Sequence, residues 1–210
     1  MEELSNTMAP SAEKIQALRA SIAQVVVGQN QATDLLLTTL IAGGHALIEG
    51  VPGVAKTLMA RLMARLVDAS FSRVQFTPDL MPSDVLGTTV FNMKTSEFDF
   101  HPGPVFADVV LADEMMQEGQ VTVDGTTHPM SPVFTIIATQ NPVEQEGTYK
   151  LPEAQLDRFL MKITMGYPTT DEEVAILTRH LAADSFAQVA QVEPVLSQAD
   201  LLALRTAARQ

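Results

Sequence analysis

The chain has 210 residues, and its 46% hydrophobic content is enough for one sizeable domain and part of another. It contains no cysteine, which excludes disulfides, thiolate metal sites and cysteine nucleophiles and favours a cytoplasmic protein. The 25 acidic residues outnumber the 13 basic ones, for a net charge of −12. Nucleic acid is therefore not an expected partner, because phosphate contacts require a basic surface.

The apolar stretches are too short for a membrane-spanning helix, which needs roughly 20 residues. The longest one, residues 35–48, is interrupted by two threonines and by Gly43-Gly44. Glu2 and Glu3 oppose a secretory signal, which begins with a basic segment. Direct membrane insertion is therefore not expected.

The first half of the chain alternates between helical and strand patterns. Apolar residues at helical spacing predict a helix over residues 11–26, and a second helix over residues 30–42 should end at Gly43-Gly44. A short apolar strand over residues 45–49 is followed by a glycine-rich turn and a helix over residues 56–66.

The second half continues this alternation, which predicts an α/β fold with a parallel sheet covered on both faces. Further buried strands are expected over residues 73–76, 109–112, 133–139 and 159–163. Two β-hairpin insertions are predicted, over residues 86–100 and 120–128, and Asp124-Gly125 suits a tight turn in the second. We expect residues 1–168 to form the α/β core and residues 169–210 to be the beginning of a helical domain, truncated at Gln210.

The turn between the first predicted strand and its helix has the pattern of a P-loop, a phosphate-binding turn. It reads Gly50-Val51-Pro52-Gly53-Val54-Ala55-Lys56-Thr57, and Leu58 follows within the helix. Small residues let backbone N–H groups surround a phosphate, and the helix N-terminus adds favourable partial charge. Lys56 would reach the β- and γ-phosphates, and the Thr57 hydroxyl would ligate Mg²⁺. The alternative is a Gly/Pro turn that precedes Lys-Thr by chance.

Ala55 departs from the strict P-loop pattern, which has glycine at that position. The methyl group of alanine is disfavoured where the backbone φ angle is positive. We therefore expect Ala55 to keep a negative φ if the turn binds phosphate.

Two adjacent carboxylates, Asp113 and Glu114, end the apolar strand over residues 109–112. Ligands bind beyond the carboxyl ends of the strands in open parallel sheets. Asp113 is predicted to hold Mg²⁺ and Glu114 to act as the base that orients the attacking water. The alternative is an ordinary strand end followed by solvated acids.

Two further residues are candidates for the reaction. Asn141 follows the strand over residues 133–139, and its amide could contact a γ-phosphate or the lytic water, although an Asn before Pro is also a frequent turn residue. Arg158 lies at a predicted helix end before the last core strand. Its alternative role is an ion pair with Asp157 or Glu153.

These motifs together resemble AAA+ ATPases, and specifically the MoxR family. The similar stretches extend over about residues 25–168 and are Val26-Val27-Gly28-Gln29, 47–57 (LIEGVPGVAKT), 75–87 (QFTPDLMPSDVLG), 103–114 (GPVFADVVLADE), 117–125 (QEGQVTVDG) and 137–159 (IATQNPVEQEGTYKLPEAQLDRF). In that family an alanine often precedes the P-loop lysine, as Ala55 does here.

The resemblance implies a P-loop AAA+ core with a five-stranded sheet, two hairpin insertions, a helical lid, and magnesium-dependent hydrolysis of ATP in hexameric rings. It also implies that Val26, Val27 and Gly28 line the adenine and that Arg158 reaches the nucleotide of a neighbouring subunit. Family members are thought to remodel or activate client proteins, often ones with von Willebrand factor A domains. Magnesium-chelatase motor subunits are close relatives.

Three alternatives remain for the function. The chain could be a hydrolysing motor, a chelatase-type motor subunit, or a nucleotide-dependent switch or scaffold with little turnover. A GTPase is disfavoured because the chain has no Asn-Lys-x-Asp motif.

The sequence departs from the family pattern in two places. Only 18 residues separate Glu114 from Val133, and the predicted hairpin takes most of them, whereas a parallel crossover normally needs a dozen or more. We therefore hypothesise that about fifteen residues of a crossover helix are missing near Met115. A sensor-2 arginine is expected beyond Gln210, because Arg205 and Arg209 do not match its motif.

Overall fold

The computed structural model describes residues 2–77, 79–113, 130–141, 156–182 and 184–209. The predicted hairpin over residues 120–128, the short crossover near Met115 and Glu114 lie outside the described residues. Within the described part of the chain, no helix is both long enough and apolar enough to cross a membrane.

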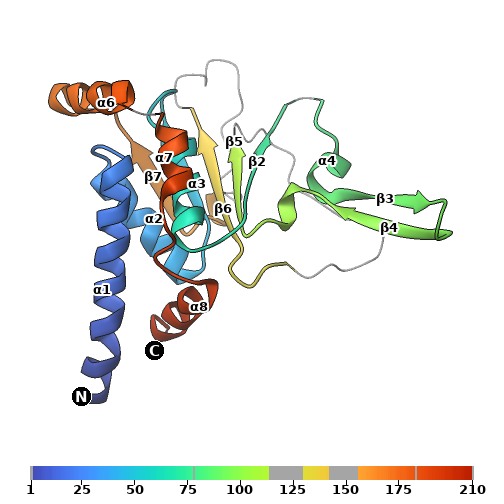
Figure 1. Cartoon of the computed structure of the whole chain (residues 1–210), viewed down its shortest axis with the longest axis horizontal. Coiled ribbons are helices and arrows are strands. Elements are labelled where there is room, and N and C mark those ends of the chain that lie inside the picture. The colour runs from blue at the N-terminus through green and yellow to red at the C-terminus, as the bar shows by residue number, and fades with distance from the viewer. Residues whose placement is uncertain (1, 78, 114–129, 142–155, 183, 210) are drawn as a thin grey trace.

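A sheet of five parallel strands forms the centre of the molecule, in the order β2-β5-β6-β1-β7 (Figure 1). This confirms the predicted α/β fold, and each strand begins within two residues of its predicted start. The strands are β1 (Ala46–Gly50), β2 (Phe71–Gln75), β5 (Val109–Asp113), β6 (Thr135–Gln140) and β7 (Met161–Met165). In the edge strand β7, buried Ile163 and Met165 alternate with exposed Lys162 and Thr164. A continuous apolar run therefore does not define the bounds of β7, which begins and ends two residues later than predicted.

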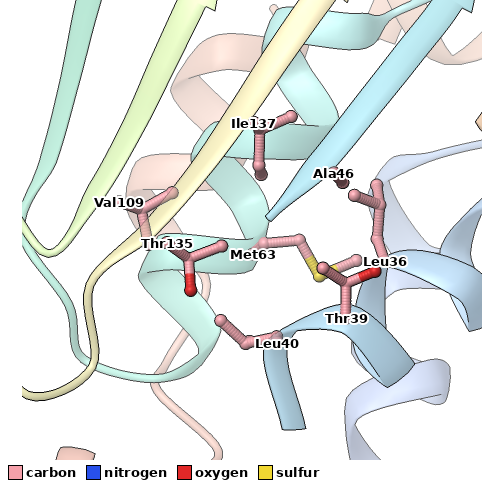
Figure 2. Close-up of a pocket in the computed structure, with 8 residues that line it drawn as sticks. All are labelled: Leu36, Thr39, Leu40, Ala46, Met63, Val109, Thr135 and Ile137. Carbon is pink, nitrogen blue, oxygen red and sulfur yellow. The ribbon is translucent and has the colours of Figure 1, made fainter. Parts of the chain in front are cut away.

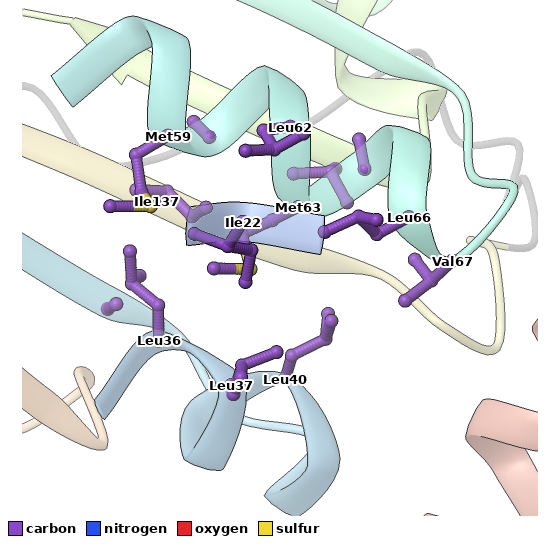
Figure 3. Packing of buried hydrophobic residues seen from close by; sticks show 14 of the residues in the cluster. Ile22, Leu36, Leu37, Leu40, Met59, Leu62, Met63, Leu66, Val67 and Ile137 are labelled. Atoms are coloured by element: carbon purple, nitrogen blue, oxygen red, sulfur yellow. The ribbon is translucent and has the colours of Figure 1, made fainter. Parts of the chain in front are cut away.

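One face of the sheet carries the main hydrophobic core, against three helices. These are α1 (Glu2–Val25), α2 (Asn30–Ala42) and α3 (Lys56–Leu66). Figure 3 shows side chains of α3, among them Leu62 and Met63, facing Leu36 and Leu40 of α2. Each large apolar side chain that is fully buried contributes about 1.5–3 kcal/mol. This packing fixes the start of α3, and with it the predicted P-loop, against the sheet.

The other face of the sheet has a smaller described core. Leu47, Ala112 and Ala138 are buried there, and Leu156 and Phe159 pack against them. The short segment that enters β7 is thereby held against the sheet.

The hairpin predicted over residues 86–100 is confirmed as β3 (Gly87–Asn92) and β4 (Glu97–Pro102). It extends away from the main sheet, between the short helix α4 (Pro82–Leu86) and the 3-10 turn η1 (Pro104–Phe106) (Figure 1). Phe91 and Phe98 lie opposite each other on it, with ring centroids 5.1 Å apart.

The described residues after β7 are mainly helical, as expected for residues 169–210, and form α6 (Thr170–Ala182), α7 (Ser185–Gln191) and α8 (Gln198–Ala207). In Figure 1, α6 lies near the carboxyl end of β7 and α8 lies towards the opposite end of the sheet. Leu196, Leu201 and Leu204 belong to the same buried cluster as α2 and α3. The division of the chain at residue 168 stays a prediction.

Arg205 of α8 is buried, with 7% of its surface exposed. Its guanidinium donates hydrogen bonds to the carbonyls of Leu40 (3.0 Å), Pro132 (3.0 Å) and Val133 (3.2 Å). Burial and the charge of Arg205 lower the pKa of His45, whose Nδ1 accepts a hydrogen bond from the backbone N–H of Ile136. The hydrogen bonds of Arg205 therefore hold α8 against the amino end of the sheet.

Asp108 joins four segments at this end of the sheet. Its buried carboxylate accepts hydrogen bonds from the backbone N–H and the hydroxyl of Ser70 (both 2.7 Å), from the Ser131 hydroxyl and from the Gln198 amide (3.2 Å). Burial alone would raise the pKa of Asp108, but the hydrogen bonds from Ser131, Ser70 and Gln198 outweigh it, and the pKa lies below its ordinary value.

Asp108→Asn should lower the free energy of unfolding by about 1–3 kcal/mol at pH 7, because the new amide N–H groups would face donors. The folded-state pKa is depressed, so the carboxylate stabilises the fold above its unfolded pKa of about 4 and loses this contribution as the pH falls below it. Urea unfolding should therefore separate the two proteins at pH 7, and the difference between them should shrink as the pH falls below about 4. Asp99→Asn, on the exposed hairpin, should change stability little at either pH.

Candidate nucleotide-binding site

The turn predicted to be a P-loop lies between the end of β1 and the start of α3. Gly50 closes β1 in a tight position, since a Cβ atom there would lie 2.8 Å from the carbonyl oxygen of Met165. Gly53 adopts a φ of +88°, in the left-handed region that favours glycine. The close approach of β7 therefore favours glycine at position 50, and the backbone conformation of the turn favours glycine at position 53.

Ala55 is a correction to the sequence analysis, because its φ is +65° and not negative. It is the N-cap of α3, and its carbonyl accepts the first helical hydrogen bond from the N–H of Met59 (2.9 Å). The left-handed conformation costs an alanine roughly 1–2 kcal/mol. The methyl group packs against the main core, which offsets part of this cost.

The P-loop residues divide by exposure into two groups. Gly50, Val54 and Leu58 are buried. Pro52 and Gly53 are exposed, whereas Val51, Ala55, Lys56 and Thr57 are half-buried. The Lys56 ammonium donates a hydrogen bond to the Gly50 carbonyl and so lies across the loop. Backbone N–H groups at a helix N-terminus and a lysine beside them form a donor set that fits a phosphate.

The predicted magnesium ligand and sensor lie at the same edge of the sheet as the P-loop. Asp113 ends β5, Asn141 directly follows β6, and β6 lies between β5 and β1. Two strand spacings put β5 about 10 Å from β1. Ala112 is level with Ala138, which is level with Leu47, so the three strands reach this edge together. Asn141 is half-buried at this edge, between Asp113 and the P-loop.

Val26–Gly28, the segment expected from the family resemblance to line the adenine, is held close to the predicted P-loop. The Gln29 side-chain amide donates to the carbonyl of Gly166 (2.9 Å), the residue after Met165 of β7. Met165 pairs with Gly50. A groove with a volume of about 380 Å³ between α1 and α2 includes Val26 and Gly28 in its lining. That volume is at the lower end of the range for small-molecule sites.

Among the predicted site residues, Arg158 lies far from the P-loop. The Arg158 side chain is exposed and lies just before β7. Two residues later, the N–H of Leu160 donates a hydrogen bond to the His45 carbonyl (2.8 Å). Because β7 runs parallel to β1, Arg158 lies at the amino edge of the sheet, opposite the P-loop. Within one subunit, Arg158 does not share the site of Lys56.

One residue of this region was missed by the sequence analysis. Glu172, in the first turn of α6, lies against Gly28, and a Cβ at Gly28 would lie 2.7 Å from its Cδ. The available signal was the pattern Thr169-x-x-Glu172, a capping box that begins a helix. Such a box marks a helix start but not what the helix start contacts.

The internal cavity between α2, α3 and the sheet is not a ligand site. It has a volume of about 10 Å³ and is lined mainly by apolar side chains, such as Leu36, Met63 and Ile137 (Figure 2). A volume of that size is about that of one water-sized sphere. Among the described residues, the carboxyl edge of the sheet and the groove between α1 and α2 therefore remain the candidate ligand sites.

Comparisons with known proteins agree with this geometry. Residues 45–161 match the ATPase family associated with various cellular activities (AAA). Over 198 residues, covering 88% of this chain, it is 46% identical to the uncharacterized protein YeaC of Bacillus subtilis and 45% identical to the chaperone MoxR1 of Mycobacterium tuberculosis. It covers 61% of the length of the first and 51% of the second.

A solved structure from Cytophaga hutchinsonii, described as a candidate ATPase, superimposes with a TM-score of 0.81. It is 40% identical, and the match covers 98% of this chain and 67% of that one. The P-loop turn, the five-stranded sheet and these similarities lead to one conclusion. The chain belongs to the AAA ATPase family, and its similarity to MoxR proteins extends over most of its length.

Proposed function

We propose that this chain binds ATP with Mg²⁺ and hydrolyses it, as a subunit of a ring-forming assembly that remodels or activates client proteins. The observation that carries the proposal is the common edge of the sheet at which the P-loop, Asp113 and Asn141 lie. Residues 1–168 are proposed as the nucleotide-binding core and residues 169–210 as the beginning of the lid.

Each candidate residue has a proposed part in the reaction. The backbone N–H groups of the P-loop and the Lys56 ammonium would hold the phosphates, and Thr57 and Asp113 would hold the metal. A bound Mg²⁺ would neutralise the charge that develops on the β- and γ-phosphate oxygens. Glu114 accepts a proton from the attacking water, and the Asn141 amide orients that water against the γ-phosphate.

The assembly and its clients are proposed from the family resemblance. A relative of similar sequence is named a chaperone, which supports action on client proteins. We propose a homo-oligomer, a hexamer by the family pattern, with clients that carry von Willebrand factor A domains. The chain spans about half to three-fifths of the length of the two curated relatives, and both the assembly and the clients are therefore proposals.

Glu114→Gln tests hydrolysis against the alternative of a binding switch. The amide cannot accept the proton of the attacking water, so phosphate release should fall by about 10²–10⁴-fold while the affinity for ATP stays within a few-fold. Phosphate release and equilibrium binding are measured on the same preparation. Glu97→Gln, on the exposed hairpin, is the matched control and should hydrolyse ATP at the wild-type rate.

A Glu114→Gln protein that releases phosphate as fast as a wild type that hydrolyses ATP above the rate in buffer alone would contradict the role of Glu114. A wild-type protein that binds ATP but releases phosphate no faster than buffer alone would instead favour the binding switch. The same variant, loaded with ATP, can then be used to capture client proteins, since it should hold the ATP-bound state.

A further inference from the structure

The first turn of α6 places a carboxylate against the backbone of Gly28. An added Cβ at Gly28 would lie 2.7 Å from the Glu172 Cδ and 3.3 Å from its Oε2. Gly28 also has a φ of +69°, which favours glycine. Glycine at this position therefore leaves room for the Glu172 carboxylate.

Two anchors hold α6 in this position. The Gln29 amide donates to the Gly166 carbonyl (2.9 Å), which fixes the turn that leads into α6. The Arg179 guanidinium donates to the carbonyls of Ala23 and Gln24 (both 3.0 Å), at the end of α1. Hydrogen bonds before and after Glu172 therefore hold its segment of α6 against Gly28.

The two oxygens of the Glu172 carboxylate have different surroundings. Oε2 accepts hydrogen bonds from the Thr169 backbone N–H (2.7 Å) and from its hydroxyl (3.0 Å). Oε1 is the atom that a Cβ at Gly28 would approach most closely. The hydrogen bonds from the Thr169 backbone and side chain lower the pKa of Glu172, so the carboxylate is charged at neutral pH.

Gly28 is close to the place where a nucleotide base would lie. Gly28 lines the groove between α1 and α2. The side-chain amide of its neighbour Gln29 donates a hydrogen bond to the carbonyl of Gly166, which follows Met165. Met165 in turn pairs with Gly50, the first residue of the P-loop. A nucleotide with its phosphates in the P-loop can therefore extend its base towards Gly28.

We propose that Glu172 determines base specificity: its Oε1 accepts a hydrogen bond from the exocyclic amino group of adenine and repels the O6 oxygen of guanine. The inference rests on the proposed nucleotide-binding function. A charged carboxylate only accepts hydrogen bonds. Adenine carries a donor at position 6, where guanine carries an acceptor. A site built around one such hydrogen bond rejects a base that leaves it unmade.

The test compares the binding of non-hydrolysable ATP and GTP analogues to Glu172→Gln and wild type. Glutamine is also a capping-box residue, so the start of α6 is retained, but its amide can turn an N–H group towards O6. The preference of the wild type for the ATP analogue should fall about tenfold or more in Glu172→Gln. Glu173→Gln removes the same charge one residue further along α6 and should leave the preference unchanged.

A second measurement uses the wild-type protein alone, so it does not depend on the folding of a variant. Purine riboside triphosphate has neither the amino group nor the oxygen at position 6, and its affinity should lie between those of the ATP and GTP analogues. An unchanged preference in Glu172→Gln, or equal affinities of the wild type for all three nucleotides, would overturn the role of Glu172 as the selecting group. Failure of the wild type to bind any of them would instead overturn the proposed function itself.

Discussion

Lys56→Ala should reduce the affinity for ATP by about two orders of magnitude or more, the largest loss of nucleotide binding that we expect from a single substitution in this chain. Truncating one partner of a close charge pair costs about 2–5 kcal/mol, and every 1.4 kcal/mol is a factor of ten in affinity. Lys56 is half-buried at the start of α3, with its ammonium across the phosphate-binding turn. No other lysine lies in this turn.

The measurement is titration calorimetry with ATP and Mg²⁺, with thermal unfolding as a check on the fold. Lys56→Ala removes a hydrogen bond to the Gly50 carbonyl, so a small decrease in stability is expected beside the loss of binding. Lys94→Ala, on the exposed hairpin, should bind ATP like the wild type. Unaltered ATP binding by Lys56→Ala would refute the assignment of the P-loop.

Arg158→Ala should reduce the ATPase rate by about 10³–10⁵-fold if Arg158 completes the site of a neighbouring subunit. The fold supports action on a neighbour, because Arg158 is exposed and precedes β7, whereas the P-loop follows β1 at the opposite edge. The four residue steps from Met161 to Met165 alone separate these edges by about 13 Å. Arg158 therefore does not reach the phosphates of its own chain.

Mixing two inactive proteins tests this action in trans. In a mixed ring, a Lys56→Ala subunit supplies an intact Arg158 to an Arg158→Ala neighbour that has an intact P-loop. Partial recovery of phosphate release is expected, and its extent should depend on the mixing ratio. No recovery, in mixtures that still assemble, would argue for a purely structural arginine.

Two further variants separate the trans role of Arg158 from an ion pair with Asp157. Arg158→Lys retains the charge but not the planar pair of donors, so it should restore little activity. Asp157→Ala removes one of the two alternative partners and should leave the ATPase rate near that of the wild type. A loss in Asp157→Ala as large as that in Arg158→Ala would instead indicate a helix-end ion pair.

The sequence by itself determined the elements that depend on neighbouring residues. Helix α3 has the predicted bounds, 56–66, because its apolar positions recur at helical spacing and it begins at the P-loop lysine. Helix α2 ends at Gly43, as predicted, because glycine adopts the left-handed conformation of a helix end at little cost (φ +75°). The P-loop could be predicted for the same reason, since its pattern consists of consecutive residues. The φ of Ala55 was the exception, because the turn it completes outweighs the preference of a single alanine.

Only the tertiary structure decided which distant segments share a site. The strand order places β6 between β1 and β5, and with it Asn141 between the P-loop and Asp113. Several contacts join segments that are far apart in the chain. They include the contact of Glu172 with Gly28 and the hydrogen bonds of Arg205 and Asp108. Such contacts arise from the packing of whole elements, which minimises buried unpaired polar groups and exposed apolar surface over the entire domain. Local sequence patterns therefore do not predict which distant segments come into contact.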